Sequence, residues 1–224
     1  MQPDRRIPWL LVAAPFLLQQ AVTVVLALVL RPPSSTGEAL YSIRFGVVIL
    51  LSYAVLVGAT VVVAARYGDP REILAIRPTP VRRTALIVVV VFAAAALATR
   101  LLEPVFHGVR AQGIDPLPFP GGAAATVGVA LAFLGVAVAG PIAEELYFRG
   151  LLQGALAPSG QVVAVGVTAA LFAAVHFVPA AIPVLAVYGV LLGLVRSRTD
   201  SIVPGAVAHA LNNAVAIALA IALA

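Results

Sequence analysis

Residues 140–150 read GPIAEELYFRG, and the three charges in this stretch interrupt long runs of alanine, valine and leucine. A charged side chain at the centre of a bilayer costs at least about 2.5–3.5 kcal/mol, so it rarely stays there without a partner or a function. Glu145 and Arg149 are four residues apart, which lets them pair on one face of a helix. Glu144 lies about 100° further round the helix and has no evident partner. We therefore expect the rest of the chain to be a scaffold around this glutamate.

The composition is that of a polytopic membrane protein. Of the 224 residues, 62% are hydrophobic and 10% are charged, whereas about 25% are charged in a soluble domain. Cysteine is absent, which excludes disulfides and thiolate metal sites. All fourteen basic residues are arginines, and the net charge of +5 sits in loops, without the basic stripe of a nucleic-acid-binding surface. We expect membrane lipid as a partner, no nucleic acid, and the plasma membrane of a bacterium with a GC-rich genome.

Apolar runs bounded by proline, glycine and charge predict the helices. The first run is too long for the apolar part of a signal peptide, and we expect it to be a transmembrane helix. Around Pro141 two interpretations stay open: the charged stretch continues the helix that begins near Ala123, which gives seven helices, or it forms a separate one, which gives eight. The other predicted helices are Ile7–Leu30, Ile43–Ala65, Thr84–Leu102, Val162–Phe177, Ile182–Val195 and Val203–Leu223.

Charge predicts the topology. The segment 66–83 carries five arginines, so by the positive-inside rule we expect it and the N-terminus to be cytoplasmic, and the Pro- and Gly-rich segment 103–122 to lie outside. Arg196 and Arg198 would be cytoplasmic only with seven helices. We expect one integral membrane domain over residues 1–224, with N-terminal helices in 1–122 and a motif-bearing catalytic core in 123–224.

Few polar residues occur in the apolar second half, and they recur at helical spacing. His176 follows Phe172 by four residues, and Asn213 follows His209 by four. A single buried histidine usually belongs to a hydrogen-bonded core, and Gly189 and Gly193 form a GxxxG face typical of ordinary helix packing. Two glutamates, an arginine, two histidines and an asparagine on successive membrane segments nevertheless indicate a functional polar cluster.

These residues resemble the three motifs of the CPBP family, in the family's order: EExxxR at Glu144–Arg149, FxxxH ending at His176, and HxxxN from His209 to Asn213. That family contains the type II CAAX prenyl endopeptidases, bacteriocin-processing and self-immunity proteins, and abortive-infection proteins. The resemblance covers about residues 139–213. It implies a multi-helix bundle with a polar cavity inside the membrane and an endopeptidase that uses a glutamate, without metal or other cofactor.

The resemblance also implies a role for each motif residue. Glu144 would be the general base and then the proton donor, because low-dielectric surroundings suit a carboxyl group to proton transfer near neutral pH. His176 would help to position the water, and His209 and Asn213 would donate to the oxyanion. Glu145 and Arg149 would form a structural pair that also tunes the charge on Glu144. The substrate would be a membrane-associated peptide or protein, with or without a lipid modification.

Three alternatives compete with this reading. In a zinc peptidase, His176, His209 and a glutamate would be ligands, but the HExxH signature is absent. A proton-coupled transporter would also use a buried Glu/His relay, although no inverted repeat is visible. The third alternative is a membrane scaffold or immunity factor without catalytic activity, which the intact motif residues disfavour.

Overall fold

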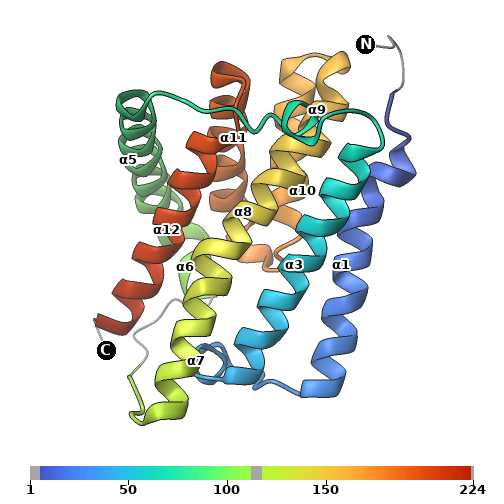
Figure 1. Ribbon diagram of the computed structural model, residues 1–224. Helices are drawn as coiled ribbons and strands as arrows, with labels where there is room; N and C mark the ends of the chain where they lie inside the picture. The colour runs from blue at the N-terminus through green and yellow to red at the C-terminus, as the bar shows by residue number, and fades with distance from the viewer. Residues whose placement is uncertain (1–5, 112–117, 223–224) are drawn as a thin grey trace.

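The computed structural model describes residues 6–111 and 118–222, which form a bundle of helices with no strand (Figure 1). The helices are α1 (Trp9–Leu30), α2 (Thr36–Leu40), α3 (Ile43–Ala65), α4 (Pro70–Ile73), α5 (Val81–Phe106), α6 (Gly108–Ala111), α7 (Ala123–Phe133), η1 (Leu134–Ala139), α8 (Gly140–Glu144), η2 (Glu145–Leu152), α9 (Gln153–Leu156), η3 (Ala157–Ser159), α10 (Gln161–Ala174), η4 (Pro179–Ala181), α11 (Ile182–Thr199) and α12 (Val203–Ala222).

Within the described ranges, six helical stretches are long and apolar enough to cross a membrane, and α10 is a further, shorter apolar helix. Large hydrophobic side chains on these helices are exposed, among them Leu28, Leu86 and Leu101. Such a surface suits lipid, where each backbone polar group must be bonded within its own helix. The predicted all-α polytopic bundle is confirmed, and the chain is an integral membrane protein.

The helix that begins at Ala123 does not break at Pro141. It continues as one helical stretch from Ala123 to Ser159, through α7, η1, α8, η2, α9 and η3 (Figure 1). Proline lacks an N–H and removes one bond from a regular helix. The turn before it, η1, is π-helical, and the N–H of Gly140 bonds the carbonyl of Gly135, five residues back. This wider turn accommodates Pro141. The charged stretch therefore continues the helix, as in the seven-helix interpretation.

Several predicted helix ends need correction. α5 extends beyond the predicted Thr84–Leu102 at both ends, and Pro104 lies in its last turn, where its missing N–H removes a single bond. α10 ends at Ala174 instead of Phe177. The chain turns there because Phe177 adopts a left-handed conformation (φ 54°) and Pro179 disfavours a helical residue before it. The predicted end of the last helix, Leu223, lies outside the described residues, as does part of the predicted loop 103–122.

The continuous helix runs through the middle of the bundle (Figure 1). α1 packs on α3, which packs on α7 and η1 at one side, while α5 packs on α11 and α12 at the other. All eight residues of η2 are buried. The charged stretch that interrupts the apolar runs thus occupies the protein-filled centre, where neighbouring helices can supply its partners.

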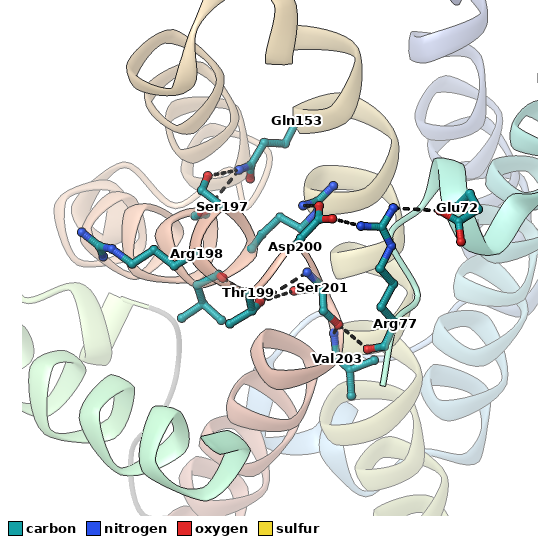
Figure 2. A network of polar contacts seen from close by, with 12 residues as sticks. Glu72, Arg77, Gln153, Ser197, Arg198, Thr199, Asp200, Ser201 and Val203 are labelled. Carbon is teal, nitrogen blue, oxygen red and sulfur yellow. Dashed lines mark hydrogen bonds and ion pairs between the residues drawn. The ribbon is translucent and has the colours of Figure 1, made fainter. Parts of the chain in front are cut away.

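The two arginine-rich segments meet at one end of the bundle (Figure 1), and Figure 2 shows the contacts between them. Arg77 pairs with Glu72 at 2.8 Å and with Asp200, which follows α11. The Ser201 hydroxyl donates to the Arg77 carbonyl at 2.6 Å. Beside this network, Leu74 is fully buried against Gly150, where a Cβ would come within 3.0 Å of the Leu74 carbonyl oxygen. The linker after α3 and the α11–α12 turn therefore form one packed cap, as the seven-helix count predicts.

Candidate active site

The two adjacent glutamates lie in different environments. Glu144 ends α8 and Glu145 begins η2, so the helical rotation between them points their side chains in different directions. The Glu145 side chain is completely buried, whereas the Glu144 side chain is 15% exposed. Glu144 is therefore the carboxylate of the two that a water molecule or a substrate can reach.

Glu145 forms an ion pair with Arg149, with 2.9 Å between Oε1 and Nη1. Both side chains are fully buried, and no aligned hydrogen bond joins them, so the contact is a close charge pair rather than a bidentate one. The guanidinium lies 4.4 Å from the ring centroid of Phe172 and donates from Nη2 to the Gly189 carbonyl at 3.2 Å. Arg149 thus joins η2 to α10 and α11. Burying its charge without Glu145 would cost more free energy than these contacts recover.

The GxxxG face of α11 accepts polar side chains from the central helix. Gln153 lies four residues after Arg149 and donates from Nε2 to the Gly193 carbonyl and to the Ser197 hydroxyl, both at 3.0 Å. Gly189 also faces α10, where a Cβ would come 2.9 Å from the Cα of Ala169. The expectation of helix packing at this face is correct, and the glycine carbonyls additionally anchor Arg149 and Gln153.

Tyr53 is the partner of Glu144 that the sequence reasoning missed. Its hydroxyl donates to Oε1 of Glu144 at 2.8 Å, and it comes from α3 in the N-terminal half. The signal was its position: tyrosine is enriched at membrane interfaces, but Tyr53 lies near the middle of a 23-residue apolar helix. A phenolic hydroxyl at that depth requires a polar partner.

His209 lies between the two glutamates. Its Nδ1 is 3.3 Å from Oε1 of Glu145, and its Nε2 is 3.8 Å from Oε2 of Glu144. An ionised carboxylate only accepts hydrogen bonds, so Nδ1 donates to Glu145 and Nε2 faces Glu144. The rings of Tyr188 and Phe172 flank the imidazole, with centroids 5.5 and 5.8 Å away. Glu145 therefore contacts both Arg149 and His209.

His176 lies just beyond the end of α10 and is half-buried. Its Nδ1 is 2.7 Å from the Phe172 carbonyl oxygen. A carbonyl can only accept, so the proton is on Nδ1, and Nε2 of the neutral ring keeps a free lone pair. Phe172 lies between the two histidines, 4.9 Å from the ring of His176. Among the described residues, no polar contact joins His176 to Glu144.

Asn213 contacts the central helix rather than the glutamates. It is half-buried, and its Nδ2 donates to the Val136 carbonyl in η1 at 3.0 Å. The π-helical turn changes the bonding of the carbonyls before Pro141, and Asn213 satisfies one of them. The structure therefore brings Glu144, Glu145, Arg149 and His209 together. In contrast, His176 and Asn213 bond to backbone carbonyls, those of Phe172 and Val136.

Within residues 6–111 and 118–222, no three His, Asp or Glu side chains are grouped as metal ligands. In particular, both nitrogens of His209 already face carboxylates, and Nδ1 of His176 is bonded to a carbonyl. These polar side chains form a chain of hydrogen bonds and close charge contacts, in the order Tyr53, Glu144, His209, Glu145 and Arg149. Such a chain can hold and transfer a proton at its accessible member, Glu144.

Comparison with known proteins agrees with the motifs. A family model described as "Type II CAAX prenyl endopeptidase Rce1-like" matches residues 126–215, the range that contains Glu144, Glu145, Arg149, His176, His209 and Asn213. No curated protein and no solved structure matches the chain. The resemblance predicted from the motifs is confirmed over this range.

Proposed function

We propose that this chain, whose residues 126–215 are similar to the Rce1-like endopeptidases, cleaves membrane-associated peptides by a metal-independent glutamate mechanism. One observation carries the proposal. Of two adjacent carboxylates, Glu145 is fully buried and contacts Arg149 and His209. Glu144 is partly exposed, and among the described residues its only hydrogen-bond partner is the Tyr53 hydroxyl. We therefore assign a structural role to Glu145 and the role of general base to Glu144.

In the proposed reaction, Glu144 takes a proton from water while the water oxygen attacks the scissile carbonyl carbon. The C–N bond then breaks as the same proton passes from Glu144 to the leaving amine, so the carboxylate is regenerated. Nε2 of His176 would accept a hydrogen bond from the second O–H of the water and so orient it, because the lone pair of Nε2 is free. Tyr53 would orient the Glu144 carboxylate, whose Oε1 it already contacts.

The oxyanion would be stabilised by His209 and Asn213, which lie one helical turn apart on α12. His209 can donate from Nε2 only when that nitrogen carries a proton, and Nε2 is the ring nitrogen that faces Glu144. Asn213 would have to exchange the Val136 carbonyl for the substrate oxygen. Catalysis would therefore require the Asn213 side-chain amide to move away from η1 towards the substrate.

The substrate would be a membrane-associated peptide, with CAAX-type or bacteriocin- and immunity-type processing as the two forms known in the family. We place the protein in the plasma membrane of a bacterium, with the N-terminus and the arginine-rich end of the bundle in the cytoplasm. The composition and the clustering of both arginine-rich segments at one end support this orientation.

The experiment is a comparison of membrane proteomes from cells that express the parent or Glu144→Ala. We expect new peptide termini in membrane-associated proteins with the parent and their loss with the variant. Identical termini in both samples, at equal expression, would contradict the peptidase assignment.

The zinc-dependent alternative has its own test on the purified protein. The glutamate mechanism predicts no stoichiometric transition metal and full activity in the presence of a chelator. About one zinc per chain, with activity lost to the chelator and restored by zinc, would replace this mechanism.

A further inference from the structure

α5 stands at the edge of the bundle and is only loosely covered. Of its 26 residues, Val91 alone is buried among those described. It packs on α11 and α12, on the opposite side of the bundle from α1 (Figure 1). Between α5 and α11 lies an open cavity of about 310 Å³. This seam is separate from the Glu144 site, since none of its lining residues belongs to that cluster.

The walls of this cavity are hydrocarbon along most of its length. α5 contributes Leu86, Ile87 and Val90, and α11 contributes Leu191, Leu194 and Val195. A groove with such walls on a membrane-facing helix matches the chemistry of an alkyl chain. It offers nothing to a polar ligand except at one end.

That end carries two arginines, Arg83 and Arg198. Arg83 donates from Nη2 to the Arg198 carbonyl at 2.9 Å, which holds the first turn of α5 against the last turn of α11. Both side chains are exposed, and no carboxylate within the described residues is within ion-pair distance of either. The first turn of α5 also contains no acidic residue.

Neighbouring arginines differ in this respect. Arg77 and Arg196 both pair with Asp200, in the network where Figure 2 shows Arg198 pointing away from the other polar groups. The cap thus neutralises its inner arginines and leaves two positive charges at the mouth of an apolar groove. Two adjacent guanidinium groups attract a phosphate and repel an ammonium group.

We propose that the α5–α11 seam binds one anionic phospholipid, with its phosphate at Arg83 and Arg198 and an acyl chain between the two helices. A zwitterionic lipid offers the same chain and phosphate, but its ammonium group opposes the two arginines. The site therefore selects lipids by headgroup charge, and it helps to fix α5, in which Val91 is the only buried residue among those described.

The test is a lipid titration of the delipidated protein in detergent, followed by native mass spectrometry. We expect the parent to bind one phosphatidylglycerol more tightly than phosphatidylcholine. Arg83→Gln/Arg198→Gln should weaken the first phosphatidylglycerol about 30-fold and leave phosphatidylcholine unchanged. The matched control is Arg66→Gln/Arg71→Gln, which removes two exposed, unpaired arginines at the same end of the bundle. It should change the affinity less than about threefold.

A second variant distinguishes a lipid whose acyl chain lies in the groove from nonspecific electrostatic attraction of anionic lipids to the two arginines. Val90→Trp keeps both arginines but fills the apolar groove from a residue that is 55% exposed, so folding should be preserved. We expect it to lose the phosphatidylglycerol preference. Retained binding in Val90→Trp, or an equal loss in the two double variants, would overturn the site. If Val90→Trp instead raises the KM for a peptide in lipid-free detergent and leaves lipid binding unchanged, the proposal is overturned and the seam binds the substrate.

Discussion

The hydroxyl of Tyr53 in α3 and the carboxylate of Glu144 in α8 are joined by a hydrogen bond of 2.8 Å. The two residues are 91 positions apart, and only one of them lies in the range that the family match covers. The N-terminal half of the chain therefore contributes directly to the candidate site.

Tyr53→Phe should lower kcat about tenfold or more while KM changes little. The variant removes one hydrogen bond to a charged group, which is worth about 1.5–3 kcal/mol, and keeps the ring. Turnover of a reporter peptide in detergent measures the effect. Tyr67→Phe, two residues after the end of α3 and outside the candidate site, is the matched control and should behave as the parent. Parental turnover in Tyr53→Phe would show that this bond does not orient the base.

Arg149→Ala should lower the free energy of unfolding by about 3–5 kcal/mol, because it leaves the Glu145 charge buried and unpaired. Glu145→Gln/Arg149→Met should cost less than the sum of the two single changes. Glu72→Gln, which breaks an exposed pair, should cost at most about 1 kcal/mol. Unfolding in detergent is measured for the parent, these variants and the two single changes Glu145→Gln and Arg149→Met. An Arg149→Ala protein as stable as the parent would rule out a structural role for the pair.

Gly189→Ala should destabilise the bundle by about 1–3 kcal/mol, because its Cβ would come 2.9 Å from the Cα of Ala169 and separate α11 from α10. Gly166→Ala is the control on α10. A Cβ there meets nothing within 4 Å, so this change should be neutral or stabilising by up to about 1 kcal/mol. Equal melting temperatures for the two variants would contradict the close approach.

Asn213→Ala should lower kcat about 10²–10³-fold if its amide donates to the oxyanion. In the structure this amide bonds the Val136 carbonyl, so a modest loss of stability should accompany the loss of rate. Asn212→Ala, at the neighbouring position, is the control. A variant that melts lower but turns over at the parental rate would restrict Asn213 to holding η1.

The sequence predicted the features that depend on local patterns. Apolar runs located the membrane helices, and the second predicted helix, Ile43–Ala65, agrees with α3 at both ends. The i, i+4 spacing of Glu145 and Arg149 predicted a contact that the structure contains. The motif spacing predicted the resemblance, because each motif is a short run of neighbouring residues and can be read without tertiary information.

The features that depend on packing were not predicted. The course of the helix at Pro141 depends on π-helical turns, whose register the residue pattern does not reveal. The Tyr53–Glu144 bond joins distant segments, and nothing in the sequence fixes which helix faces Glu144. For the same reason, the contact of Asn213 with Val136 and that of His209 with Glu145 required the three-dimensional arrangement.

Glu144→Gln tests the central claim most directly, since it keeps the size of the side chain and a hydrogen-bonding group for Tyr53 but removes the basicity. Turnover of a reporter peptide in detergent is measured beside a melting curve. We predict a melting temperature equal to or above that of the parent, because a partly buried charge is removed, and a peptidase rate at least about 10²-fold lower. A Glu144→Gln protein that folds normally and cleaves at nearly the parental rate would contradict the glutamate mechanism.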